Sequence, residues 1–478
     1  SSRLARVPAP RRPPAPLPPR AGGRASAGHG GHAARVDRRE LMLSPRTARA
    51  PSAPGSGLGV LARLRRFGPR SRSSASGMSP GPRPGVSPTE PGPPDAPRDG
   101  CLGFRLMPEP DTIAVRPANV AEFSMPQELL AFVPPVEAIT SRFRNGDSER
   151  KIHCNVELGE AELEKLGMLR ELASAQGRAF EPALAAAATR YLGRARWDHK
   201  RALRDMSATQ EWRLAYFKAG PISDASVSED LARGMVYFVG RDRLLRPALV
   251  LRPARIPPAW YADTGAASER VLGLLVFCLE YMLRHMLLPG RAEGAVVLLD
   301  LAGLTSSQVP FGPLRRILTV LSNHYVNRVF KFYILHTPPA LAVVAQLGLK
   351  LLTERQRQKL HFVRRLEELA EDFASHQLEE DFGGARPAIR EFLPFPLLPG
   401  PFDANHRGGQ NPRAVPGLHA LFSPAAVRGR AWDPDRSLGE NTRLEPSARA
   451  PGAAAALVAL ERAGLCPDWL RDAGGGCE

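Results

Sequence analysis

The spacing of apolar residues predicts helices in the segment that begins near residue 158. Leucines recur at every third position within residues 160–176, which places them on one face of a helix. Residues 182–196 have a second helical pattern, and Asp198 is a residue type that caps the start of a third helix. The apolar positions of that third segment are Trp197, Ala202, Met206, Trp212 and Tyr216. We therefore expect a small helical lobe over residues 158–220.

The pattern changes to that of strands at residue 234. Residues 234–253 indicate two strands joined by a turn, because two apolar runs flank the polar sequence GRDRLLRP. Residues 295–301 form a continuous, β-branched run between glycines, which predicts a strand buried on both faces. A helix over 313–327 and a second buried strand over 329–335 complete a strand–helix–strand unit. Its crossover should be right-handed.

Shorter signals complete the predicted domain. Asp300 ends the first buried strand and should cap the turn that follows it, rather than act as a base. Thr353 and Gln356 have the spacing of a capping box, which predicts a helix start. A short strand over 359–363 and an acidic helix over 364–373 should follow. Farther along the chain, residues 453–464 predict one more short helix.

One apolar stretch, residues 271–289, is long enough to cross a membrane. It contains Glu280, Arg284 and His285. A charged group at a helix centre costs about 2.5–3.5 kcal/mol even on the mildest insertion scale. We therefore expect a half-buried helix within 268–288, with Glu280 and Arg284 paired on its solvent-facing side.

Composition indicates that both ends of the chain differ from its middle. The 43 Gly and 48 Pro crowd into the ends, and residues 1–100 hold 18 Arg, no Lys and 5 acids, so they carry +13 of the formal net charge of +17. Such segments bury too little apolar surface to fold. We expect residues 1–157 to be a disordered tail and linker, and 385–478 a mostly disordered tail. For residues 1–36, a transit peptide is the alternative.

The sequence offers no pattern typical of an enzyme. The five cysteines are scattered without a CxxC pair, the histidines have no metal-ligand spacing, and no GxSxG motif is present. We therefore predict no catalytic residue, no metal and no cofactor.

Six segments together resemble the CRAL-TRIO lipid-binding family, in its order and spacing. They cover about 225 residues, under half of the chain, and are RYLGRARWDHKRAL, GRDRLLRPALV, AVVLLDLAGL, YVNRVFKFYILHTPP, LTERQRQKL and LEEDFGG. The resemblance implies an α/β fold in which a helical lobe precedes a mixed, mostly parallel sheet with flanking helices, over residues 221–384. The sheet would be the floor of an apolar lipid pocket, and residues 340–358 a helical gate. We expect residues 158–384 to fold alone.

The resemblance also implies which residues touch the lipid. Lys359 stands where phosphatidylinositol-binding members have a basic residue, whereas Asn327 replaces their Glu and Gln356 replaces a hydroxyl residue. With Tyr325, these residues form the expected headgroup site. The expected gate and pocket residues are Leu341, Val344, Leu347, Leu351, Phe332 and Leu298.

We therefore predict a monomer that binds one phospholipid or isoprenoid without turning it over, and that transfers or senses it at a membrane surface. The predicted location is cytoplasmic and peripheral to membranes, or organellar if residues 1–36 are a transit peptide. An alternative is a membrane-targeting or protein-interaction module without free lipid exchange, whose Arg-rich tail binds anionic lipid. A nucleic-acid partner is disfavoured, since Phe67 alone interleaves with the arginines.

Overall fold

The computed structural model describes residues 103–260, 265–305, 311–339, 341–342, 354–422, 435–437, 440–441 and 453–464. The predicted tail over 1–100, the capping residue Thr353 and the gate residues Val344, Leu347 and Leu351 lie outside these ranges.

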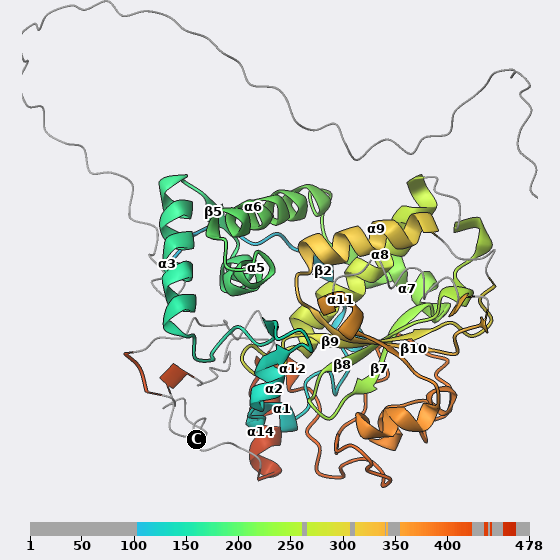
Figure 1. Ribbon diagram of the computed structural model, residues 1–478. Helices are drawn as coiled ribbons and strands as arrows, with labels where there is room; N and C mark the ends of the chain where they lie inside the picture. The colour runs from blue at the N-terminus through green and yellow to red at the C-terminus, as the bar shows by residue number, and fades with distance from the viewer. Residues whose placement is uncertain are drawn as a thin grey trace, which may run out of the picture. The chain divides into compact units, whose positions relative to one another are not determined.

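A mixed five-stranded sheet forms the centre of the fold (Figure 1). Its order is β11-β10-β9-β8-β7, with every neighbouring pair parallel except β7 and β8. The strands are β7 (Val236–Arg241), β8 (Pro247–Leu251), β9 (Ala295–Asp300), β10 (Val329–Leu335) and β11 (Leu360–Phe362). The predicted hairpin, the two predicted strands and the mostly parallel sheet are confirmed, but burial on both faces is not complete, since residues 329–332 of β10 are only half-buried. The predicted cap is present too, because Asp300 accepts a 3.0 Å hydrogen bond from the N–H of Ala302.

Helices cover one face of this sheet and short 3₁₀ segments cover the other. Figure 1 draws α8 and α9 above the strands, and the segment around residues 366–382 below them. The helices are α7 (Asp224–Ala232), α8 (Gly265–Tyr281) and α9 (Phe311–His324), and α8 continues into a π-helical turn over Met282–Met286. The predicted acidic helix over 364–373 is instead a 3₁₀ helix, Leu366–Glu371.

The helical lobe precedes the sheet, as predicted. It consists of α3 (Glu160–Ala175), α4 (Pro182–Ala186), α5 (Ala188–Arg194) and α6 (His199–Tyr216). Asp198 caps α6, since its carboxylate accepts the backbone N–H groups of Lys200 and Arg201 at 3.0 Å. The leucine pattern is also confirmed, because Leu166 and Leu169 of α3 are buried in the lobe's own core.

The lobe begins close to the predicted residue 158, with α3 at Glu160, but the prediction that residues 1–157 are a disordered tail and linker is wrong for residues 103–157, which form structure. Their longest elements are α1 (Glu128–Ala131), α2 (Val136–Ile139) and the hairpin of β3 (Thr140–Arg142) with β4 (Ser148–Arg150). Single strand pairs attach this segment to the lobe and to the sheet domain: β1 (Arg105–Leu106) with β5 (Ala179–Phe180), and β2 (Ile113–Ala114) with β6 (Ile222–Ser223).

The predicted domain end at 384 agrees with the ordered sheet domain, but the prediction of a mostly disordered tail over 385–478 is wrong for its described part. Residues 385–422 pack on the domain, and α12 (His419–Phe422) and α14 (Ala453–Arg462) share a core with α1. The predicted helix over 453–464 is thereby confirmed. The buried members of this core include Met125, Leu129, Leu288, Phe402, Leu418, Phe422 and Leu460.

Candidate functional site

One face of the sheet carries two rows of apolar side chains across four strands. Register partners of adjacent strands share a face. The first row is Leu251, Leu299, Ile334 and Phe362, and the second is Leu249, Val297, Phe332 and Leu360.

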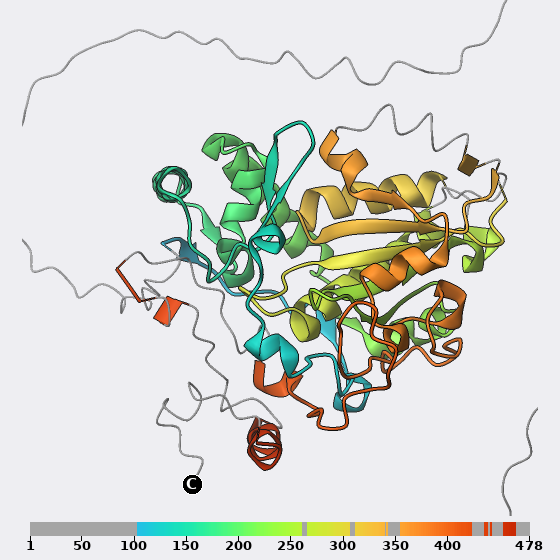
Figure 2. The same cartoon turned by 60° about the horizontal axis from the view of Figure 1, so that its bottom comes forward.

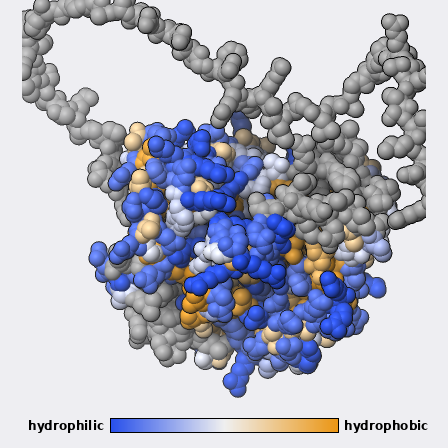
Figure 3. Space-filling model, in the orientation of Figure 1, coloured by the Kyte–Doolittle hydropathy of each residue, from blue (hydrophilic) through white to orange (hydrophobic). Residues whose placement is uncertain are grey.

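Five members of these rows are only half-buried. Three lie on the inner strands β8, β9 and β10, where partial exposure of an apolar side chain is unusual (Leu251, Leu299 and Phe332), and two lie on the edge strand β11 (Leu360 and Phe362). We call the sheet face that carries these two rows the apolar floor. In Figure 3, which has the orientation of Figure 1, the described surface is mainly hydrophilic with smaller apolar patches.

The opposite face is closed by hydrogen bonds from the sheet to the 3₁₀ segment. The Tyr333 hydroxyl donates to Asp372 at 2.6 Å, and the Tyr237 hydroxyl donates to Glu379 at 2.6 Å. Leu298 lies on this face, because it is the register partner of Tyr333, and it is fully buried. The two predicted pocket residues on the sheet therefore point to opposite sides, Phe332 to the apolar floor and Leu298 away from it.

Lys359 lies directly before floor residue Leu360 and is paired with a carboxylate. Its Nζ is 3.1 Å from Oε1 of Glu149, a residue of β4, and its side chain is 20% exposed. The same carboxylate forms an ion pair with Lys151. Burial acts to raise the pKa of Glu149, but the two ammonium groups hold it below its ordinary value. Sequence patterns alone did not point to Glu149 or Lys151.

The other predicted headgroup residues do not gather around Lys359. Tyr325 is buried and donates a 2.7 Å hydrogen bond to Glu280. Asn327 has a left-handed backbone, φ +54°, and its carbonyl accepts from Arg190 at 3.0 Å. Gln356 is nearer, since its carbonyl accepts the N–H of Lys359 at 3.2 Å. Tyr325 and Asn327 thus connect the α9–β10 loop to buried charged groups instead of to a headgroup site.

A buried charge cluster joins the helical lobe to the sheet domain. Arg213 of α6 donates to Glu280 of α8 at 2.8 Å and forms an ion pair with Glu181, and all three side chains are under 10% exposed. The predicted pairing of Glu280 with Arg284 on a wet face is therefore wrong. Arg284 instead donates to the carbonyl of Ile113 at 2.9 Å. Burial and the neighbouring acids Glu109 and Glu280 raise the pKa of Glu181 to about 7, although Arg213 opposes this.

Comparison with known proteins identifies the sheet domain. Residues 231–384 match the model of the CRAL/TRIO domain, a segment that contains the apolar floor and Lys359. The chain contains a CRAL-TRIO domain. CRAL-TRIO domains are in general lipid-binding.

Two CRAL-TRIO domain-containing proteins of Schizosaccharomyces pombe are similar to this chain. One is 26% identical over 197 residues, which cover 41% of this chain and 18% of the relative. The other is 23% identical over 206 residues, with 41% and 45% covered. The chain thus spans less than half of each relative. The crystal structure of Sfh5 aligns with a TM-score of 0.39 and 8% identity, over 50% of this chain and 96% of that chain.

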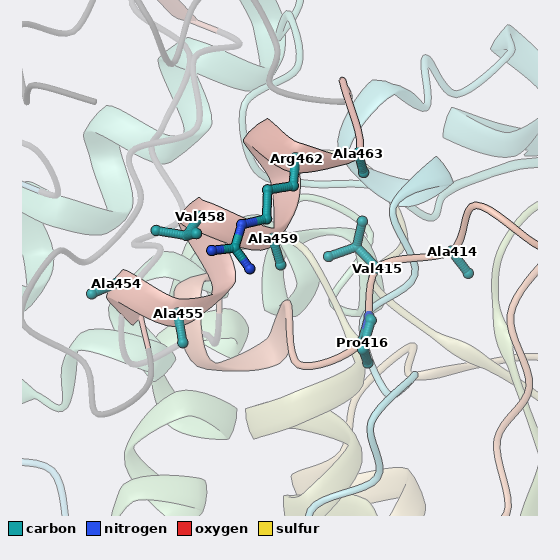
Figure 4. Close-up of a pocket in the computed structure, with 9 residues that line it drawn as sticks. All are labelled: Ala414, Val415, Pro416, Ala454, Ala455, Val458, Ala459, Arg462 and Ala463. Carbon is teal, nitrogen blue, oxygen red and sulfur yellow. The ribbon is translucent and has the colours of Figure 1, made fainter. Parts of the chain in front are cut away.

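Some features lie apart from the floor of the CRAL-TRIO domain. A pocket of about 630 Å³ lies between α14 and residues 414–416, with Val458 and Arg462 among its lining residues (Figure 4).

Within the described ranges, no helix is long and apolar enough to cross a membrane. In the same ranges, no group of three His, Cys, Asp or Glu side chains is placed to hold a metal ion.

Proposed function

We propose that the CRAL-TRIO domain binds a single lipid, with acyl chains on the apolar floor, and transfers or senses it at a membrane surface without chemical conversion. The half-buried residues Leu251, Leu299 and Phe332 on the inner strands support this, because apolar side chains at the centre of a sheet are ordinarily buried completely. Burying an acyl chain taken from water releases about 0.8 kcal/mol per CH₂ group. Taking it from a bilayer exchanges one apolar surrounding for another, so the same floor permits release.

The headgroup contact in this proposal is Lys359. It lies next to floor residue Leu360 along the chain, and its ammonium group would pair with a phosphate. The gate in this proposal rests on sequence, since Leu341, Val344, Leu347 and Leu351 share one face of a helix at their three- and four-residue spacing. A charge on that face would be disfavoured both over a lipid and on a bilayer.

One observation favours the alternative of a membrane-targeting module without free exchange. Lys359 already has a carboxylate partner in Glu149, so its charge is not freely available to a headgroup. In that alternative the domain would hold no exchangeable lipid, and the Arg-rich N-terminus would supply the membrane contact.

Lipid extraction from the purified chain, followed by mass spectrometry, separates these proposals. We expect an intact lipid to copurify and to remain unchanged on incubation. Leu299→Asp places a charge on the apolar floor, so we expect the lipid content to fall at least about tenfold while the chain stays folded, because unpaired charges are costly in apolar surroundings. Melting curves measured in parallel would show that folding is retained.

The matched control is Leu298→Ala, on the same strand but the opposite face. It should lower the free energy of unfolding by about 2–5 kcal/mol, as leucine truncation in a core does, yet leave the lipid content of the folded fraction unchanged. An unchanged lipid content in folded Leu299→Asp would contradict the assignment of the floor. Lipid-free wild-type protein would contradict lipid binding itself.

A further inference from the structure

Ion pairs connect the β3–β4 hairpin to the residues that precede β11, although the two segments are about 200 positions apart in sequence (Figure 2). Asp147 of the hairpin forms a two-pronged ion pair with Arg355 of α11 (Glu354–Gln358), with 2.5 Å between Asp147 Oδ2 and Arg355 Nε. Arg355 also donates to the carbonyl of Ser148 at 3.0 Å. The second connection is the ion pair of Glu149 with Lys359. The hairpin lies outside residues 231–384, which match the CRAL/TRIO domain, yet its Glu149 contacts Lys359, the predicted headgroup residue.

At the second connection, two lysine side chains pair with one carboxylate. The Glu149 carboxylate pairs with both Lys151 and Lys359, and all three side chains are at most 20% exposed. Burial, and to a lesser degree the charge of Lys359, lower the pKa of Lys151 to about 7, although Glu149 opposes both. A phosphate monoester carries roughly −1.5 to −2 charges at pH 7 and has three acceptor oxygens. It would neutralise both lysines where Glu149 neutralises one.

We propose that Glu149 occupies an anion site formed by Lys151 and Lys359, and that the phosphate monoester of a lipid headgroup displaces it and frees the hairpin from Lys359. This inference rests on the proposed lipid binding and adds a ligand class to it. Glu149 then acts as a competitor within the chain, which lowers affinity for every anionic headgroup. Zwitterionic lipids offer too little net charge to displace it, so the competitor also confers selectivity.

Release and binding are reciprocal in this scheme. A headgroup that binds better when Glu149 is displaced must itself promote displacement by the same factor. The Asp147–Arg355 pair does not involve either lysine, so it keeps the hairpin attached at one point after Glu149 has left. The hairpin would loosen around Glu149 without leaving the domain.

The test uses the full chain and vesicles of phosphatidylcholine, with or without phosphatidic acid. Glu149→Gln should raise the affinity for phosphatidic acid vesicles about tenfold, within the usual range of such couplings, and leave phosphatidylcholine binding unchanged. Glu149→Gln combined with Lys359→Ala should lose the gain. Since every variant keeps the same Arg-rich N-terminus, its contribution to vesicle binding cancels in the comparison.

The matched control is Asp147→Asn, which removes a carboxylate from the same hairpin without changing the partners of Lys151 or Lys359. Its affinity for phosphatidic acid vesicles should stay within about threefold of the wild type. Trypsin cleavage after the exposed Arg142 and Arg144 reports on the hairpin. In the wild type, phosphatidic acid vesicles should accelerate this cleavage and inorganic phosphate should not. Acceleration by inorganic phosphate alone would assign the site to free phosphate and overturn the lipid assignment.

Two further outcomes would overturn the inference. One is an unchanged affinity of folded Glu149→Gln for phosphatidic acid vesicles, and the other is an equal gain from Asp147→Asn, which would indicate general loosening of the hairpin. If lipid still copurifies in either case, lipid binding stands and only the anion site fails. If lipid copurifies with neither the wild type nor Glu149→Gln, both fail together.

Discussion

Replacing Arg213 by Met should remove a large part of the protein's folding free energy. Arg213 is the cation between Glu280 and Glu181, and without it two buried carboxylates lose their counter-ion. Removing one partner of a buried ion pair costs about 3–5 kcal/mol. Because a whole domain is stabilised by only about 5–15 kcal/mol, the melting temperature should fall by roughly 6–20 °C. Thermal unfolding followed by circular dichroism measures this.

The control for this substitution is Arg178→Met, at an arginine whose pairing with Glu211 is exposed. Exposed pairs contribute about 0–1 kcal/mol, so this variant should melt close to the wild type. If both variants melted at the wild-type temperature, the buried cluster would not hold the lobe to the sheet domain.

The loss in Arg213→Met should also depend on pH. Without the guanidinium, burial raises the pKa of Glu280 above its unfolded value, so the folded state favours the protonated acid. A raised folded-state pKa contributes stability that is present at low pH and lost as the pH rises. The wild type already contains such a group, because the pKa of Glu181 is raised to about 7 from an ordinary 4.5. The defect of the variant should therefore be smaller at pH 5 than at pH 8.

The main elements of the sheet domain could be predicted because each has a regular pattern in its own sequence. Residues 295–300 and 329–335 are short runs rich in apolar β-branched and aromatic residues, which favours strands, and the structure places them side by side. Asp198 was predictable as a cap because the capping interaction is local, reaching only to Lys200 and Arg201. Local interactions of this kind leave their pattern in adjacent residues.

Interactions between distant residues left no such pattern. Glu280 and Arg284 have ideal helical spacing for a pair, yet the partner of Glu280 is Arg213, 67 positions upstream. Glu149 reaches Lys359 across 210 positions. In the candidate site, the two predicted pocket residues on the sheet, Phe332 and Leu298, point to opposite faces. A one-residue step along a strand reverses the side, and only the register with β10 decides it.

The segments that flank the domain were missed for a related reason. Elements of two to four residues, such as β1 and α1, are too short to show periodicity and are held by what they contact. Proline, which is frequent there, suggested disorder. Buried prolyl-flanked residues such as Phe395 instead pack against Phe238 and Tyr281, at ring-centroid distances of 5.1 Å and 4.7 Å.

These flanking contacts predict that residues 158–384 will not fold alone, contrary to the expectation from sequence. Arg241 is fully buried, and its guanidinium donates to the carbonyls of Ser124 at 2.5 Å and Met286 at 2.6 Å. The fragment lacks Ser124, which leaves part of a buried cation without an acceptor. It also lacks Phe395 and so opens a cavity beside Phe238. Removing a buried Phe side chain alone costs about 3–5 kcal/mol, and an unsatisfied buried charge adds several more.

Losses of this size together approach the whole folding free energy of a typical domain, about 5–15 kcal/mol. We therefore expect residues 158–384 to give no cooperative thermal transition by circular dichroism, whereas residues 103–464 should unfold cooperatively. Fragments 103–384 and 158–464, each lacking one flank, should melt between these limits. Their order would show which flank contributes more. Cooperative melting of 158–384 within a few degrees of 103–464 would mean that the flanks rest on the domain without stabilising it.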